Sequence, residues 1–240
     1  MAVAAPPFTG FSPGAIQFLA DLAVNNDRAW FQPRKADYER LLKEPLEALV
    51  ATLAERFEAR GIPLQADPKR SPFRIYRDTR FSKDKSPYKT QVTAAFPWVE
   101  KGSVDAFHEH GNPGGYFHLQ PGTVYVGGGM WHPPTPIITA FRRSIVDDPA
   151  GLRGLLDDKQ FASMFDGLSG EKLTRVPPGF PKDHPEAELL KLKDMTFGRR
   201  LSDQDVYTPA LVDTIVDSMA VAAPVMRYLA TVGQDSSRSA

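Results

Sequence analysis

Hydrophobic positions in the first quarter of the chain repeat with the 3.6-residue period of an α-helix. One apolar face predicts a helix over residues 13–24, and Asp27 is placed to cap a short turn after it. A longer pattern runs from Pro33 to Gly61, and we expect Pro45 to kink this helix or divide it in two. Its apolar positions are Tyr38, Leu41, Leu42, Leu46, Leu49, Val50, Leu53 and Phe57.

The pattern changes in the middle of the chain, where short β-branched and aromatic runs predict strands. These runs are residues 73–77, 91–98, 115–120 and 123–127. Pro121-Gly122 predicts a two-residue turn that sets His118 opposite Tyr125, with Phe117 and Leu119 on one sheet face and Tyr116 and His118 on the other. A bulge at the turn is the alternative.

Helical periodicity returns in the second half. Helices are expected from Thr135, over 149–156 and 159–165, from Pro185, and from Thr208 to the end of the domain with a kink at Pro224. A strand is expected over 195–201.

Strands grouped between helices predict a single α+β domain, with long N- and C-terminal helices packed on a mainly antiparallel sheet. We place this domain at residues 8–232, with flexible tails at 1–7 and 233–240.

Composition narrows the possible functions. The chain has 240 residues, no formal net charge and no cysteine, which argues against non-specific nucleic-acid or membrane binding by the whole surface and excludes disulfides. The N-terminus lacks the pattern of a signal peptide, and no apolar run approaches the about 20 residues of a membrane span. We therefore expect a cytoplasmic protein without a membrane partner.

One segment departs from this neutral average. Residues 74–89 hold six cations against only Asp78 and Asp84. Clustered guanidinium and ammonium groups beside hydroxyls favour an anion such as a phosphate or a carboxylate. The candidate anion-binding residues are Arg74, Arg77, Arg80, Lys83, Lys85 and Lys89. The alternative is an internal network in which Asp78, Asp84 and other carboxylates neutralise these cations.

Other residues could complete such a site. His118 is the candidate general acid or base, although a histidine hydrogen-bonded across the hairpin is the more common case. Tyr116 and Trp131 are candidates to stack on a flat ligand, or else to pack as ordinary large apolar groups. Arg199 is expected to join the site from a neighbouring strand unless it is an exposed edge charge.

Two further features carry weaker hypotheses. The triplet Gly127-Gly128-Gly129 either lets the backbone approach a ligand or forms a tight strand exit. His108-Glu109-His110 has metal-compatible chemistry, but its spacing in a glycine-rich loop is a poor ligand pattern, so we expect no metal and no cofactor.

Several stretches occur in the order seen in a known family. They are Phe8-Thr9-Gly10-Phe11, Asn26-Asp27-Arg28-Ala29-Trp30-Phe31, the run from Arg74 to Lys89, Gly115-Tyr116-Phe117-His118-Leu119, Gly127-Gly128-Gly129-Met130-Trp131, and Leu192-Lys193-Asp194 with the residues up to Arg199. On these residues the chain resembles the bacterial and fungal family catalogued as domain of unknown function 2461. The resemblance implies one α+β domain over nearly the whole chain, and it implies no particular reaction.

Three hypotheses follow from the sequence. The first is a pocket beside the sheet that binds a phosphate- or carboxylate-bearing small molecule, with or without catalysis. The second is a module that binds nucleic acid or an acidic partner through the same basic segment. The third is a scaffold domain in which the cations stabilise the fold. The sequence does not decide whether the protein is an enzyme, nor its oligomeric state.

Overall fold

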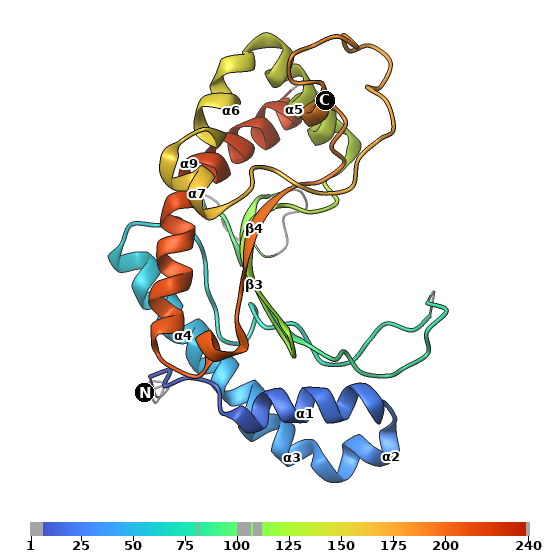
Figure 1. Ribbon diagram of the computed structural model, residues 1–240, viewed down its shortest axis with the longest axis vertical. Helices are drawn as coiled ribbons and strands as arrows, with labels where there is room; N and C mark the ends of the chain where they lie inside the picture. The colour runs from blue at the N-terminus through green and yellow to red at the C-terminus, as the bar shows by residue number, and fades with distance from the viewer. Residues whose placement is uncertain (1–6, 81, 100–106, 108–111, 239–240) are drawn as a thin grey trace.

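The sheet lies at the centre of the computed structural model, which describes residues 7–80, 82–99, 107 and 112–238 (Figure 1). Its four strands are β1 (Val92–Pro97), β2 (Gly114–Gln120), β3 (Thr123–Met130) and β4 (Met195–Leu201), paired in the order β1-β2-β3-β4. All three pairings are antiparallel. The predicted α+β architecture with an antiparallel sheet is therefore confirmed.

The hairpin between β2 and β3 has the predicted register. Gln120 pairs with Thr123 around a two-residue turn, His118 lies opposite Tyr125, and Gly122 takes a φ of +69°. Phe117 and its neighbours on the same face are fully buried, whereas Tyr116 and Tyr125 on the other face are only half-buried. The alternation divides the sheet into a core face and a more open face.

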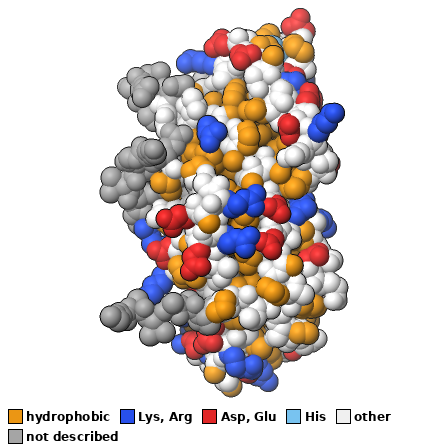
Figure 2. All heavy atoms as spheres, turned by 90° about the vertical axis from the view of Figure 1, so that its left-hand side faces the viewer, with side chains coloured by type: hydrophobic (Ala, Val, Ile, Leu, Met, Phe, Trp, Pro, Cys, Tyr) orange, Lys and Arg blue, Asp and Glu red, His pale blue; other side chains and the backbone are white. Residues whose placement is uncertain are grey.

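Helices from both ends of the chain cover the core face. They are α4 (Glu44–Ala59), which packs against β1, and α9 (Ala210–Arg238), which packs against β3 and β2 (Figure 1). The approach is close at Gly115, where an added Cβ would lie 2.7 Å from the Met219 sulfur. Salt bridges Arg56–Asp213 and Arg60–Asp217 join the two helices on the outside, where Figure 2 shows charges of both signs side by side.

The N-terminal helices follow the predicted pattern with one difference. α1 (Pro13–Val24) is followed by α2 (Arg28–Phe31), whose N-cap Asp27 accepts a hydrogen bond from Trp30 N at 2.8 Å. A 3₁₀ turn (Gln32–Arg34) and α3 (Lys35–Tyr38) lead to a π-helical turn (Glu39–Lys43) directly before α4. The chain stays helical past Pro45, because the wider π-helical turn before it makes room for the proline ring and for the carbonyl that receives no hydrogen bond from proline.

The remaining helices gather at one end of the sheet (Figure 1). α5 (Thr135–Asp147) and α6 (Pro149–Leu156) pack on α9, and α7 (Lys159–Met164) brings Phe161 against Phe197 of β4. The helix expected from Pro185 is only the single turn α8 (Ala187–Leu190). A 3₁₀ turn (Asp203–Val206), with Ser202 and Asp205 forming a capping box, leads into α9.

The expected strand over residues 73–77 is not a strand of the sheet. The segment meets β1 only around one bridge, Pro72 to Ala94, and Phe73 N bonds to Thr93 O at 2.9 Å. Beyond Phe73 the chain leaves β1 and pairs with residues 87–89, for example through Lys89 N and Ile75 O at 2.7 Å. The basic segment thus forms an arm that projects from the body of the protein (Figure 1).

The expectation for the glycine triplet is also corrected. The triplet Gly127–Gly129 is no strand exit, since β3 continues through it to Met130 and pairs with strands on both sides. An added Cβ at Gly127 would lie 2.2 Å from Phe197 O, so the missing side chain permits this close pairing.

The C-terminal helix is longer than predicted. α9 remains helical from Ala210 to Arg238, through Pro224 and past the expected domain end at Val232. By length and composition, its residues 210–234 also pass the test for a membrane span, with a mean hydropathy of 1.3. In the fold, its buried side chains, such as Ile215, Met219 and Met226, belong to the hydrophobic core.

Candidate functional site

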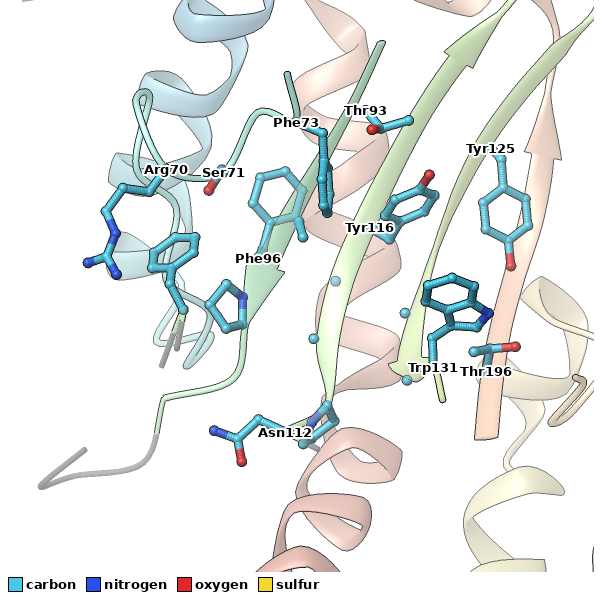
Figure 3. Close-up of a pocket in the computed structure, with 18 of the residues that line it drawn as sticks. Arg70, Ser71, Phe73, Thr93, Phe96, Asn112, Tyr116, Tyr125, Trp131 and Thr196 are labelled. Atoms are coloured by element: carbon cyan, nitrogen blue, oxygen red, sulfur yellow. The ribbon is translucent and has the colours of Figure 1, made fainter. Parts of the chain in front are cut away.

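A cavity of about 710 Å³ lies on the open face of the sheet. We call it the open-face cavity. Tyr116, Tyr125, Trp131 and Thr196 gather on one side of it, and Phe73 and Arg70 come from the segment beside β1 on the other (Figure 3). Its volume and its largely aromatic walls with a few polar groups are typical of a small-molecule site.

Large side chains are unusually exposed at the cavity. Trp131 is 74% exposed and Phe73 is 48% exposed, although both are apolar. The backbone of Gly128 and Gly129 forms part of the wall because these positions carry no side chain. Exposed aromatic faces beside bare backbone offer a planar ligand both stacking and close approach.

Lys89 provides a positive charge at the cavity wall. Its side chain is half-buried, and its Nζ lies 5.2 Å from the centroid of the Phe73 ring. Within the described ranges, no carboxylate lies within ion-pair distance of it. Burial lowers the pKa of Lys89, and the positive charge of Arg74 lowers it further. An anion here would offset both effects, because an opposite charge favours the protonated form.

His118 lies next to the cavity but does not line it. Its Nδ1 is 3.3 Å from the Tyr116 hydroxyl, and its Nε2 is 3.3 Å from Gln120 Oε1. Burial lowers the pKa of His118, and the hydrogen bond to Gln120 opposes part of this effect. The predicted acid or base could therefore act on a ligand only through Tyr116, which does line the cavity.

Tyr116 and Tyr125 are held in place by polar contacts. Burial raises the pKa of Tyr116, while a hydrogen bond from Thr93 partly offsets this rise. The Tyr125 hydroxyl donates to Phe197 O at 3.0 Å, so the ring lies flat over β4. Both phenols are neutral at pH 7, and they can present hydroxyl groups to a ligand.

The arm separates most of the predicted anion-binding residues from the cavity. Arg80 makes a two-pronged contact with Asp78, at 3.0 and 2.7 Å, and Arg77 pairs with Asp84. Lys85 donates to the Thr79 carbonyl at 2.8 Å. Arg74 and Lys83 are exposed, and neither lines the open-face cavity or the hollow at the base of the arm.

A second, more polar hollow of about 460 Å³ lies at the base of the arm. Arg77, Asp84 and Lys89 are among its lining residues. Lys89 therefore borders both hollows. Asn26 secures the arm beside them, because its side chain donates to Tyr88 O at 2.9 Å and accepts from Tyr88 N at 3.0 Å.

Arg199 does not join the predicted group. It pairs with Val126, whose side chain points into the core, so Arg199 starts on the core face of the sheet. Its Nε is buried, with no hydrogen-bond partner in the part of the chain that the structure describes. The sequence pattern placed Arg199 in a strand correctly, but the strand register decides its face.

Sequence reasoning missed a histidine–aspartate pair at the Trp131 end of the cavity. His132 Nδ1 lies 2.8 Å from Asp194 Oδ1, and His132 N donates to the same oxygen at 2.7 Å. Burial pushes the pKa of Asp194 upward, but hydrogen bonds from His132 and Glu171 N outweigh it, so the pKa lies below its ordinary value. The sequence does contain a signal for this pair. His132 directly follows Trp131, and Asp194 is the last residue of the Leu192-Lys193-Asp194 stretch.

Metal ligands are not grouped in the described residues, where no set of three histidine or acidic side chains is placed to hold an ion. His108, Glu109 and His110 lie outside the described residues.

The comparisons with known proteins identify the family of the chain. The chain belongs to the DUF2461 family of conserved hypothetical proteins, which matches it over residues 14–228. The predicted resemblance is thus confirmed. No curated protein and no solved structure matches the chain significantly.

Proposed function

We propose that the protein binds a small anionic molecule bearing a flat ring in the open-face cavity. Lys89 would contact the anionic group, and Tyr116 and Trp131 would flank the ring. The observation that carries this proposal is the half-buried ammonium group of Lys89, which borders the cavity beside an aromatic ring and a second cation. A group in that position favours an anion as its counter-charge.

The cavity wall supports a ring-bearing ligand over a simple inorganic anion. Phe73, Tyr116, Tyr125 and Trp131 contribute aromatic surface around one hollow, and an inorganic ion would leave that surface in contact with water. Thr93, Thr196 and Gln91 supply hydrogen-bonding groups at the same wall. This combination suits a ligand with polar substituents, such as a mononucleotide or an aromatic acid.

Nucleic acid on the arm is a second candidate, since the arm projects from the body and carries six cations against two aspartates. The pairs Arg80–Asp78 and Arg77–Asp84 weaken it, because they already engage two of its guanidinium groups. These ion pairs are also what the third hypothesis predicts, in which the cations stabilise the fold of a scaffold domain. Extended contact with phosphates would make binding fall steeply with salt, whereas one contact in a cavity gives a shallow dependence.

Calorimetric titration with charge-matched probes tests the proposal. Adenosine 5′-monophosphate is compared with adenosine, and 4-hydroxybenzoate with 4-hydroxybenzyl alcohol. We expect the charged member of at least one pair to bind more tightly, and Lys89→Met to weaken that binding about tenfold, the loss expected for one charge-assisted contact.

Lys83→Met is the matched control, since Lys83 lies on the same arm and borders neither hollow. It should leave the affinity of the probe unchanged. Equal losses in the two variants, with a steep salt dependence, would instead support polyanion binding by the arm. Equal affinity for charged and neutral probes would contradict an anionic ligand.

A further inference from the structure

The pair formed by His132 and Asp194 has the geometry of an oriented base. Asp194 is almost completely buried, with 3% of its side chain exposed, while 57% of the His132 side chain is exposed. The buried oxygen accepts from His132 Nδ1, so that nitrogen carries the ring proton. Nε2 therefore keeps its lone pair on the exposed side of the ring.

The carboxylate is itself fixed from several sides. Asp194 Oδ1 accepts from both the backbone and the ring of His132, and Oδ2 accepts from Glu171 N at 3.1 Å. These bonds join the end of β3, the start of β4 and the loop before it. Because both oxygens are engaged, the carboxylate cannot rotate, and it holds the imidazole in one orientation.

His132 has an unusual backbone conformation. Its φ of +50° is the only positive value at a non-glycine residue in the described chain. Such a conformation is a few-per-cent event outside glycine, and it occurs preferentially at functional sites. It turns the imidazole back onto Trp131, where the two rings stack with centroids 4.1 Å apart.

Neighbours of His132 and Asp194 in the sequence line the open-face cavity. Trp131 lines the open-face cavity, and so does Thr196, two residues after Asp194. His132 itself does not line the cavity, because its ring stacks on that of Trp131, which does. The charged groups around it are Asp194 and, from the loop before β4, Glu171, which Lys193 neutralises at 2.6 Å.

We propose that His132 is a general base beside the open-face cavity, held in its reactive tautomer by Asp194. In the step it would catalyse, Nε2 takes a proton from a water molecule beside the ligand, or from a ligand hydroxyl group that extends past Trp131. The O–H bond breaks, the N–H bond forms, and the Asp194 carboxylate balances the imidazolium charge. This inference rests on the proposed function for its substrate, a ring-bearing anion, but not for the reactivity of the imidazole.

Diethyl pyrocarbonate tests that reactivity without a known ligand. The reagent transfers a carbethoxy group to an unprotonated imidazole nitrogen with loss of ethanol and CO₂, and mass spectrometry of peptides gives a rate for each histidine. His184 is an internal control: its Nδ1 accepts from Glu186 N at 3.0 Å, so its Nε2 carries the proton. We expect His132 to react about tenfold faster than His184, because only its exposed nitrogen has a free lone pair.

Variants separate orientation from simple exposure. Asp194→Asn leaves one oxygen for the three N–H groups that the carboxylate accepts from, and it removes the negative charge beside the ring. His132 then becomes a weaker nucleophile, so its carbethoxylation should slow about tenfold. Glu171→Gln removes a nearby charge without touching the ring and should leave the rate within about twofold, a small electrostatic effect for an exposed group. Should Asp194→Asn fail to fold, the rate of His132 is compared with that of a histidine in an unstructured peptide, which is more exposed but lacks the carboxylate; a faster reaction of His132 supports the inference and a slower one contradicts it.

A probe that binds the cavity should protect His132 and not His184. Reaction of His132 at the His184 rate, or a rate unaffected by Asp194→Asn, overturns the inference even if probes bind through Lys89. Fast, Asp194-dependent reaction without any probe binding supports the base and contradicts the proposed function instead.

Discussion

The absence of a side chain at Gly198 determines where the Tyr125 ring lies. An added Cβ there would be 2.0 Å from the Tyr125 hydroxyl oxygen, and at Gly127 it would be 2.8 Å from the same ring. Gly127 of β3 pairs with Gly198 of β4, and because neither residue has a side chain, the Tyr125 ring can lie flat against the backbone there. The ring can then reach Phe197 O and form part of the cavity wall.

Gly198→Ala should therefore act through Tyr125. We expect it to lower the free energy of unfolding by about 1–3 kcal/mol, the usual cost of an overpacked position. The loss should largely disappear in a Tyr125→Ala background, because the clashing atoms are gone. Urea denaturation of the four proteins of the cycle measures this.

Gly127→Ala is the matched control for that cycle. Its added Cβ would meet the Phe197 carbonyl at 2.2 Å, and backbone cannot move aside as a side chain can. Its cost should persist when Tyr125 is truncated. Equal rescue of both alanine variants would show that the ring is not the obstacle at Gly198.

Prolines show how an element responds to its place in the fold. Pro136 occupies the first turn of α5, where proline needs no hydrogen-bond partner, whereas Pro224 lies inside α9. α9 nevertheless continues to Arg238, because its apolar face is packed along the core. Tertiary packing outweighs the local preference against a helix at this position.

Pro224→Ala should consequently stabilise the protein. Pro224 is exposed, so alanine restores a helical hydrogen bond without leaving a buried void, and the gain can reach about 3 kcal/mol. Pro136→Ala should be neutral or slightly destabilising, because proline suits that position. Thermal unfolding of both variants provides the measurement. A destabilised Pro224→Ala would mean that the proline ring makes an essential contact.

The sequence identified the basic segment that forms the arm, but it did not show where its side chains lie relative to the cavity. Its cations were expected to converge on one recess, yet Arg77 and Arg80 pair within the arm, and Arg199 belongs to the other face of the sheet. The open-face cavity unites only three of the predicted residues, Lys89, Tyr116 and Trp131. Charge composition therefore indicated an anion, but not which cation meets it.

At the scale of the molecule, many carboxylates in the described residues pair with a basic side chain. Glu186 is an example: a hydrogen bond from Arg153 lowers its pKa, although burial opposes the effect. Hydrogen bonds from lysines likewise lower the pKa of Glu171 and of Glu188. These carboxylates bind protons less readily in the folded state than in the unfolded chain, so acid favours unfolding.

The pH dependence of stability follows from this sign. A carboxylate with a lowered folded pKa stabilises the protein above its unfolded pKa of about 4.3, and that contribution is lost as the pH falls through the folded value. We expect the urea midpoint to fall between pH 5 and pH 3, and Glu186→Gln to make this fall smaller. Arg153→Gln should flatten the profile in the same way, because it removes the cause of the shift. An unchanged slope in both variants would contradict this account.

Local sequence determined the helices, the strands, the hairpin register and the fold class. Periodicity, capping residues such as Asp27 and the Pro121-Gly122 turn act over a few residues, so they can be read without a structure. The same locality explains the failures at residues 73–77 and at the glycine triplet, where the outcome depends on distant partners.

Tertiary structure alone decided which side chains share the candidate site. Lys89 meets Tyr116 and Trp131 only because β1, β2 and β3 lie side by side, and His132 meets Asp194 across 62 residues of sequence. The order of residues along the chain does not contain these distances. They result from the packing of the helices on one face of the sheet, which leaves the other face open.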